Sequence, residues 1–284
     1  MNTPAPSLTP NSPVPPGAPI PNVLSIAGTD PSGGAGIQAD LKTFGALGAY
    51  GMSAITAVVA QNTQGVRGVV ALDPGFVADQ IDAVFEDVRV DAVKLGMMAN
   101  AGIIRAVADR LRAHAPRNIV FDPVMIAKSG DPLLDPEAIE ALRSELVPLA
   151  TVITPNLPEA AVLLDRADDW TAEDMAFELP ALHALGPEWV LLKGGHLSAS
   201  KESVDLLFGA EVSRRYRGPR LVTRNDHGTG CTLSAAIAAL LPRLPMEQAV
   251  ARAKTYLLGA LASAGRLDVG QGHGPLNHFH QLWS

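Results

Sequence analysis

Residues 225–240 read NDHGTGCTLSAAIAAL, a glycine-rich turn that runs directly into an apolar helical pattern. The first N–H groups of a helix have no partners within the helix, and the helix dipole places partial positive charge at that end. Gly228 and Gly230 allow a bound group to approach the backbone, because glycine has no Cβ atom. The turn therefore predicts an anion site, most often for a phosphate, although a turn that only caps a core helix has the same pattern.

The only cysteine of the chain, Cys231, stands at the start of this helix. A thiol near a helix N-terminus has a lowered pKa, so the sequence predicts a reactive thiol. A single cysteine also excludes an internal disulfide and is typical of a protein of the reducing cytoplasm.

A second glycine-rich turn lies in residues 23–42, VLSIAGTDPSGGAGIQADLK, between an apolar strand and a helical pattern. Ligands of α/β proteins bind at the carboxyl ends of such strands. This turn is neither the dinucleotide-binding fingerprint nor a P-loop, because the spacing differs and no Gly-Lys-Ser/Thr follows. Glycines that served only strand–helix packing would need neither Asp30 nor Asp40.

Short β-rich runs alternate with helical patterns along most of the chain. The runs cover residues 53–60, 92–95, 118–121, 152–153 and 189–192, and the helical patterns cover residues 76–87, 101–114, 136–146, 157–165 and 172–185. An antiparallel pair over 204–208 and 214–217 and two closing helices follow. The pattern predicts an α/β fold, a three-layer αβα sandwich with a mainly parallel central sheet, in a single domain over residues 22–284.

Composition narrows the class of protein. The net charge of −7 argues against nucleic acid or a membrane surface as partner, and no apolar run is long enough for a membrane span. Residues 1–21 are rich in proline and carry no charged side chain, so we expect a disordered extension that is not a secretory signal.

The motifs of residues 22–284 together resemble the bacterial hydroxymethylpyrimidine kinase/phosphomethylpyrimidine kinase family of thiamine biosynthesis, in the ribokinase-like superfamily. The resemblance rests on AGTDPSGGAGIQADLKTFGALGAYG (27–51), AVVAQNTQGV (57–66), KLGMMA (94–99), DPVMIAKSGDPLL (122–134), ITPNLPEAAVLL (153–164), LLKGGHL (191–197), HGTGCTLSAAIAAL (227–240) and GHGPLNHFH (272–280). It implies a ribokinase-like fold, ATP and Mg²⁺ as cofactors, and a cytoplasmic homodimer.

Two motifs are candidates for the phosphate and metal side. Asn156 and Glu159 fit a helix N-cap with an acidic first turn, whereas the resemblance implies the N-x-x-E metal and phosphate motif. Asp122 either forms an Asp-Pro turn or helps to hold Mg²⁺. Lys193, which ends a strand, is either solvated or reaches a nucleotide phosphate. The resemblance thus places Mg²⁺ at Glu159 and Asp122, and ATP at Lys193, Asn156 and Thr229.

The acceptor side is expected at Gln61, whose amide supplies a coplanar donor and acceptor for a pyrimidine. The resemblance adds four further residues to this pocket: Gly28, Asp40, Met97 and Val124. For Met97 and Val124, plain core packing is the alternative interpretation.

Cys231 stands where most ribokinase-like kinases have an aspartate base, and the resemblance implies that it takes the hydroxyl proton, beside the donors at Gly228 and Gly230. The acceptor of a second phosphorylation is already anionic and needs no base. Met52 replaces a cysteine that relatives often have, and we expect no catalytic consequence. His196 and His227 are expected to be structural or hydrogen-bonding partners.

The predicted activity is therefore ATP-dependent phosphorylation of 4-amino-5-hydroxymethyl-2-methylpyrimidine to its monophosphate and then its diphosphate. A pyridoxine/pyridoxal kinase is the alternative within the same class. A non-catalytic pyrimidine-phosphate sensor is the alternative from another class, but it would not need Asn156, Glu159 and the turn at 228–231 together. A nicotinamide-dependent oxidoreductase is excluded by the missing fingerprint.

Overall fold

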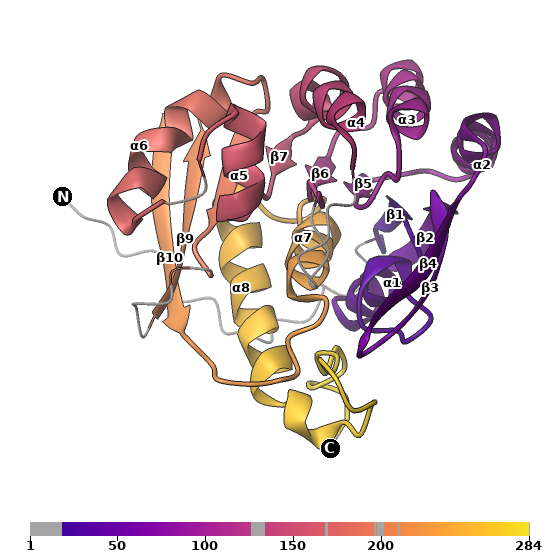
Figure 1. Cartoon of the computed structure of the whole chain (residues 1–284). Coiled ribbons are helices and arrows are strands. Elements are labelled where there is room, and N and C mark those ends of the chain that lie inside the picture. The colour runs from indigo at the N-terminus through magenta and orange to yellow at the C-terminus, as the bar shows by residue number, and fades with distance from the viewer. Residues whose placement is uncertain are drawn as a thin grey trace.

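The computed structural model describes residues 19–125, 134–167, 170–195, 197, 202–209 and 211–283. Its centre is an eight-stranded sheet in the order β10-β9-β8-β7-β6-β5-β1-β2 (Figure 1). Every pairing from β2 to β8 is parallel, and β9 and β10 continue the sheet with antiparallel pairings. The strands are β1 (Asn22–Ala27), β2 (Tyr50–Ile55), β5 (Ala92–Leu95), β6 (Ile119–Phe121), β7 (Val152–Ile153), β8 (Trp189–Lys193), β9 (Glu202–Gly209) and β10 (Val212–Pro219).

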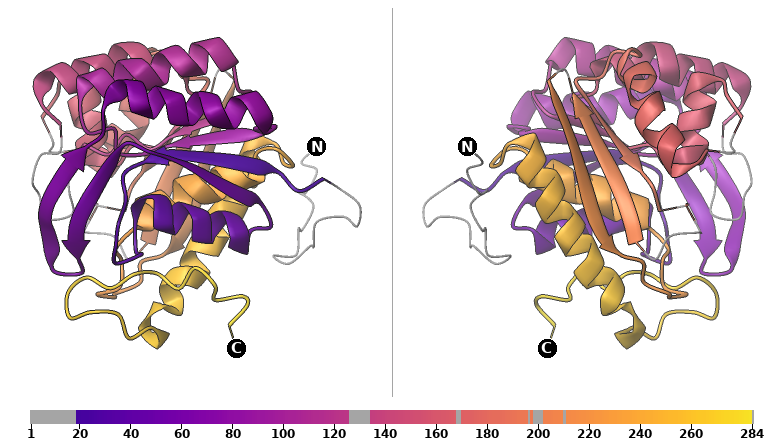
Figure 2. Two further views of the ribbon diagram at one scale, coloured as in Figure 1. Left: turned by 90° about the vertical axis from the view of Figure 1, so that its right-hand side faces the viewer. Right: turned by 90° about the vertical axis from the view of Figure 1, so that its left-hand side faces the viewer.

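Helices cover both faces of this sheet, which confirms the predicted three layers (Figures 1 and 2). One face packs against α1 (Gly36–Ala46), α7 (Thr229–Leu240) and α8 (Met246–Ala262). The other packs against α2 (Pro74–Asp87), α3 (Ala101–His114), α4 (Pro136–Ala141), α5 (Leu157–Leu164) and α6 (Ala172–His183). Helix α7 is buried from its fourth residue to its end, as expected for a helix that is apolar all round.

The run at residues 53–60, expected as one strand, is divided between two sheets. Strand β2 ends at Ile55, and β3 (Ala57–Asn62) pairs with β4 (Gly65–Ala71) in a separate hairpin. The break comes from two hydrogen bonds to the start of the first glycine turn: Thr56 N donates to Ala27 O, and Ala57 O accepts from Thr29 N. After Ile55 the chain therefore leaves the main sheet and continues over the first glycine turn. The pattern expected as a helix over 136–146 also changes, since a π-helical turn (Leu142–Leu146) follows α4.

Both glycine turns lie at the carboxyl ends of the parallel strands, where α1 and α7 begin. Among the described residues, none of the helices has the length and apolar character needed to cross a membrane.

Candidate active site

The two glycine turns form one surface, although they lie far apart in the sequence. Gly228 has a φ of +84°, and a Cβ atom there would stand 1.8 Å from Gly34 O. His227 Nε2 lies 2.8 Å from Asp30 Oδ2, a contact between residues 197 positions apart. Only glycine tolerates both this φ and this closeness, so the glycine at 228 is required by the meeting of the turns.

Asp30 organises the first turn. Its carboxylate accepts hydrogen bonds from the backbone N–H groups of Ser32, Gly34 and Ala35. Burial opposes the ionisation of Asp30, but hydrogen bonds from His227, Ser32 and Gln61 hold its pKa below the usual range. The expectation that His227 is a hydrogen-bonding partner is therefore confirmed. His196 lies outside the described residues.

Three charged side chains meet where β6, β7 and β8 end. Lys193 Nζ lies 2.8 Å from Asp122 Oδ1 and 3.9 Å from Glu159 Oε2. Asp122 also accepts a hydrogen bond from Thr154 Oγ1 at 3.1 Å. Lys193 is mostly buried, so the interpretation of a solvated lysine at a strand end is wrong.

The start of α7 faces this cluster. A Cβ atom at Gly230 would lie 3.3 Å from Lys193 Nζ and 3.4 Å from Asp122 Oδ2. The structure therefore brings the backbone donors of the turn, the lysine and the carboxylates together. The hydroxyl of Thr229 donates within its own turn, to Asp226 O at 2.6 Å.

Asn156 and Glu159 form a reciprocal helix cap at the start of α5. Asn156 Oδ1 accepts from Glu159 N, and Glu159 Oε2 accepts from Asn156 N. The cap and a functional role are compatible, because the same Glu159 carboxylate is buried beside Lys193. Burial, with Asp122 nearby and against the effect of Lys193, raises the pKa of Glu159 to about 7.

The donor set of this cluster fits a hydrated Mg²⁺. Carboxylate oxygens are the ligands that Mg²⁺ prefers, and it usually takes only one or two of them besides water and phosphate oxygens. Glu159 and Asp122 supply such oxygens, and both carboxylates lie beside the same Lys193 ammonium group, at 3.9 Å and 2.8 Å.

A second buried ion pair lies among the residues expected to bind the acceptor, between β5 and α1. Asp40 Oδ2 accepts from Lys94 Nζ at 2.9 Å and from Ser25 Oγ at 2.6 Å, and all three side chains are buried. Asp40 Oδ1 is buried without a hydrogen-bond partner. A bare buried acceptor is costly, so a donor on a bound molecule would complete it.

Lys94 is a buried charged residue for which no role was expected from the sequence. The feature of the sequence that could have indicated a role for this lysine is its position inside the apolar run AVKL. A strand covered on both faces cannot hold an ammonium group without a partner.

The other residues expected in the acceptor pocket come from neighbouring segments. A Cβ atom at Gly28 would lie 2.5 Å from Met97 Cε, so the absence of a side chain at 28 makes room for Met97. Gln61 follows a β-bulge and hydrogen-bonds to the Asp30 carboxyl. Val124 is partly buried two residues after Asp122.

Cys231 corrects one expectation. Burial, with Asp40 and Asp122 nearby, raises the pKa of its thiol to about 11, against the lowering effects of Lys94 and of a hydrogen bond from Gly36 N–H. The expected lowered pKa is wrong for this arrangement, because the loss of water around the sulfur outweighs the field of the helix N-terminus.

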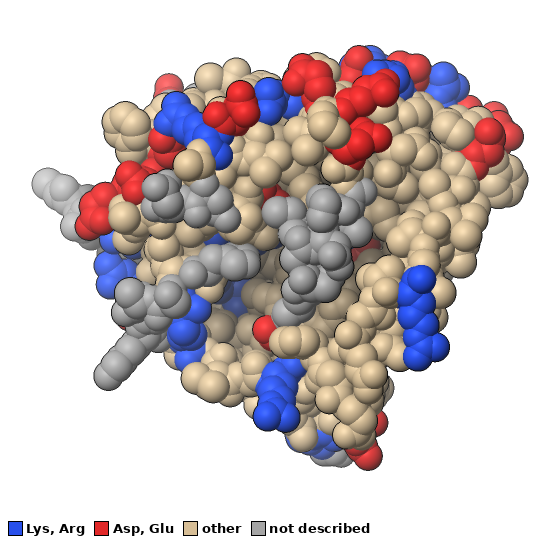
Figure 3. Space-filling view, viewed as in Figure 1, with Lys and Arg blue, Asp and Glu red and all other residues tan. Residues whose placement is uncertain are grey.

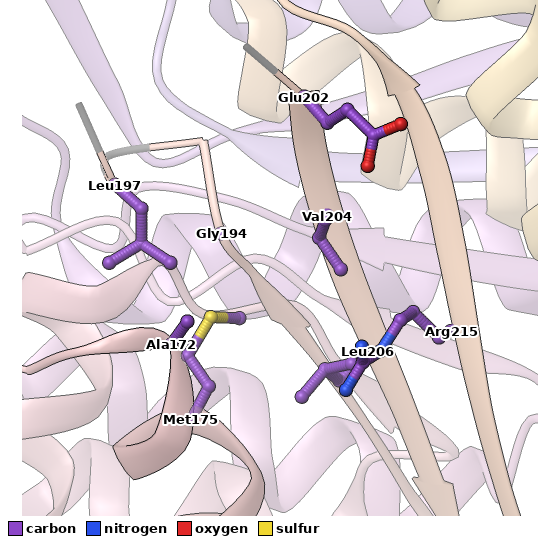
Figure 4. A pocket seen from close by; sticks show the side chains of 8 residues that line it. All are labelled: Ala172, Met175, Gly194, Leu197, Glu202, Val204, Leu206 and Arg215. Carbon is purple, nitrogen blue, oxygen red and sulfur yellow. The ribbon is translucent and has the colours of Figure 1, made fainter. Parts of the chain in front are cut away.

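A cavity of about 100 Å³ lies elsewhere, between α6 and the strands β9 and β10 (Figure 4). Its wall is largely apolar, with Met175 and Leu206 on opposite sides and Gly194 at its edge. It lies on the α6 face of the sheet, and none of the predicted site residues lines it.

The sequence pattern of the family described as phosphomethylpyrimidine kinase matches residues 30–277. The chain belongs to this family. The hydroxymethylpyrimidine/phosphomethylpyrimidine kinase of Salmonella typhimurium is 58% identical over 263 residues, which cover 92% of this chain and 98% of that protein.

Solved structures agree with this kinase family. The phosphomethylpyrimidine kinase of Clostridium difficile has a TM-score of 0.75 at 45% identity, with 84% of this chain and 99% of that chain covered. The pyridoxal kinase of Bacillus subtilis, solved as an ADP complex, has a TM-score of 0.85 at 36% identity. The match covers 93% of this chain and 99% of that chain. The fold is therefore ribokinase-like, as predicted.

Proposed function

We propose that this chain is an ATP-dependent kinase of thiamine diphosphate biosynthesis that phosphorylates 4-amino-5-hydroxymethyl-2-methylpyrimidine to its monophosphate and then to its diphosphate. The observation that carries the proposal is the approach of Gly230, in the turn at 228–231, to the buried Lys193 and Asp122, with Glu159 beside Lys193. A non-catalytic sensor would have no use for this arrangement beside an acceptor pocket.

Phosphoryl transfer depends mainly on positioning and on charge stabilisation. We assign binding of the transferred group to the backbone donors at Gly228 and Gly230 and to Lys193, whose ammonium group faces them. Asn156 and Thr229 stand at the start of α5 and α7, on the nucleotide side. Glu159 and Asp122 would hold Mg²⁺, directly or through water, and Mg²⁺ would neutralise charge on the phosphates.

On the acceptor side, the amide of Gln61 supplies a donor and an acceptor in one plane, and Asp40 Oδ1 supplies a bare acceptor. Met97, beside Gly28, and Val124 form apolar walls. Cys231, as the thiolate, accepts the hydroxyl proton in the first reaction and is idle in the second.

A pyridoxal kinase is the second candidate, because a structure of that activity has the TM-score of 0.85. One experiment separates the two: turnover of ATP with the hydroxymethylpyrimidine, its monophosphate and pyridoxal, each assayed alone. We expect efficient turnover of both pyrimidines. Efficient turnover of pyridoxal alone would contradict the proposal.

We also propose a cytoplasmic homodimer, with residues 22–284 as one domain. The β3–β4 hairpin exposes the cross-strand pair Val58 and Val70, at 50% and 66%, with Val69 and Val66 nearby. The hairpin side of the molecule carries few charges, whereas charged side chains gather over the helices at the top (Figure 3). Exposed apolar patches of this kind are typical of interfaces. Light scattering of the wild type and of a Val58→Lys/Val70→Lys variant tests the dimer.

A further inference from the structure

The turn of the β3–β4 hairpin is fixed, although much of the hairpin is exposed. Thr63, in this turn, is buried, whereas its neighbours Asn62 and Gln64 are exposed. Figure 2 shows the hairpin leaving the edge of the main sheet and the yellow C-terminal segment passing beside its far end. Residues 270–275 of this segment are called here the C-terminal strap.

The strap holds Thr63 by its side chain and by its backbone. Gly272 N donates to Thr63 Oγ1 at 3.1 Å, and His273 N donates to Thr63 O at 2.8 Å. A Cβ atom at Gly272 would lie 2.0 Å from Thr63 O, and one at Gly270, where φ is +71°, would lie 2.2 Å from Thr63 Oγ1. These two glycines form the socket into which Thr63 fits.

The other end of the strap is joined to the turn before α7. Gly274 O accepts from His227 N at 3.1 Å, and His273 Nδ1 lies 3.1 Å from Asp226 Oδ1. A Cβ atom at Gly274 would lie 2.2 Å from Asn225 Oδ1. The strap therefore connects the hairpin turn to the phosphate-binding turn through a few backbone contacts.

Gln61 lies between the two fixed points of the hairpin. At its base, Thr29 Oγ1 accepts from Val59 N at 3.0 Å, and at its turn the strap holds Thr63. A β-bulge between Ala60 and Gln61 interrupts the alternation of side chains there. Bulges redirect a side chain, and a redirected side chain stays in place only if the flanking chain is held.

We infer that Thr63 is a positioning residue for the acceptor: through the strap it holds Gln61 at the pyrimidine and at a set distance from the turn at 228–231. The inference rests on the proposed function, in which Gln61 binds the pyrimidine. The strap holds the turn before α7 through other hydrogen bonds, those of His273 Nδ1 and Gly274 O, so loss of the bond between Thr63 and Gly272 N weakens the acceptor site and leaves nucleotide binding unchanged.

The test compares Thr63→Val with Thr63→Ser. Valine keeps the branched shape but leaves Gly272 N without its acceptor, whereas serine keeps the hydroxyl group. A hydrogen bond of this kind contributes about 0.5–1.5 kcal/mol, so we expect the KM for the hydroxymethylpyrimidine to rise about 2–12-fold in Thr63→Val. The KM for ATP should not change, and Thr63→Ser should resemble the wild type. Equal increases of both KM values, or no rescue by serine, would overturn the inference.

Two further measurements separate the inference from the proposed function. In a Gln61→Leu background, Thr63→Val should have little further effect on pyrimidine affinity, because the residue acts through Gln61; additive losses would overturn the inference. Amide hydrogen exchange of residues 60–64 in the ligand-free protein needs no substrate and should be faster in Thr63→Val than in Thr63→Ser. Unchanged exchange would contradict the role of the strap, whereas a wild type that leaves the pyrimidine unphosphorylated would contradict the proposed function.

A glycine pair supplies the matched control. Gly272→Ala places a Cβ atom against the backbone of Thr63, whereas Gly265→Ala meets no atom within 4 Å. We expect the KM for the pyrimidine to rise at least as much in Gly272→Ala as in Thr63→Val, and to stay at the wild-type value in Gly265→Ala. A larger effect of Gly265→Ala than of Gly272→Ala would overturn the inference.

Discussion

Lys94 Nζ lies 2.9 Å from Asp40 Oδ2, and neither side chain has any exposed surface. Burial raises the pKa of the Asp40 carboxyl, and the ammonium group of Lys94 opposes this shift because it favours the ionised carboxylate. Lys94 also opposes the upward shift in the pKa of Cys231. One buried lysine thus influences both the acceptor pocket and the proposed base.

Removing this lysine should destabilise the protein strongly. We expect Lys94→Met to lower the free energy of unfolding by about 3–5 kcal/mol, because Asp40 is left as an unpaired buried group. Urea unfolding measures the change. Arg105→Met is the control, since the Arg105–Glu137 pair is exposed and contributes at most about 1 kcal/mol.

The double variant Lys94→Met/Asp40→Leu separates stability from function. Replacing a buried ion pair by apolar side chains is often neutral, so we expect most of the stability to return. Pyrimidine binding should be lost in this double variant, because the acceptor at Asp40 is gone. Recovery of binding together with stability would show that the pair only supports the fold.

Gln61→Leu should weaken pyrimidine binding and leave ATP binding intact. Leucine is close in size but removes the planar donor and acceptor, so a polar group of the substrate is left unpaired at a cost of about 1–3 kcal/mol. Calorimetry with each ligand measures the two affinities. Gln64→Leu, at an exposed position of the same hairpin, is the control. Unchanged pyrimidine affinity would identify Gln61 as a packing residue.

Glu159 should make stability depend on pH in a defined window. Its pKa is raised from 4.5 to about 7 in the folded protein, so its contribution to stability is fully present below about pH 4.5 and is lost as the pH rises through about 7. Relative to the wild type, Glu159→Gln should therefore gain stability between these values, by at most about 1.4 kcal/mol per pH unit. Thermal unfolding of both proteins across this range measures the difference.

Mg²⁺ with a nucleotide should reverse this dependence if Glu159 helps to hold the ion. A cation favours the ionised carboxylate, so we expect the ligand to stabilise the wild type more at pH 8 than at pH 6. Glu159→Gln should lose most of this pH dependence. An identical pH dependence in the variant would place the ion elsewhere.

The strands and helices that carry the site could largely be predicted from the sequence. The strand at 92–95 and the helix at 101–114 lie where periodicity placed them, because each is a long or strongly apolar segment with clear ends. The break at Thr56 could not be predicted, because it depends on hydrogen bonds to Ala27 and Thr29, which are distant in the sequence.

The ionisation of Cys231 was harder to predict than its place at the start of α7. The sign of its pKa shift depends on burial and on Asp40 and Asp122, which only the folded chain brings near. The socket for Thr63 also needs Gly270 and Gly272; Gly272 opens the motif at 272–280, but the sequence does not indicate that Thr63 is its partner. The pKa of Cys231 and the socket for Thr63 both depend on contacts between residues that are far apart in the sequence.

Cys231→Ala should reduce the first phosphorylation much more than the second. The first acceptor is a neutral alcohol, for which a positioned base contributes about 10²–10⁴-fold, whereas the second acceptor is already anionic. Alanine leaves the backbone donors at Gly228 and Gly230 in place for both steps. The two rates are measured separately at saturating ATP and Mg²⁺.

The raised pKa of Cys231 gives this prediction a second readout. With a thiol pKa of about 11, the thiolate fraction rises about tenfold per pH unit near neutrality, so kcat/KM of the first step should increase with pH in the wild type. That increase should be absent in Cys231→Ala.

Cys231→Asp should restore much of the first step, because a carboxylate is ionised at neutral pH, and should impair the second by placing negative charge beside an anionic acceptor. Equal losses in both steps for Cys231→Ala would mean that the thiol is structural and that the donors at the start of α7 carry the chemistry.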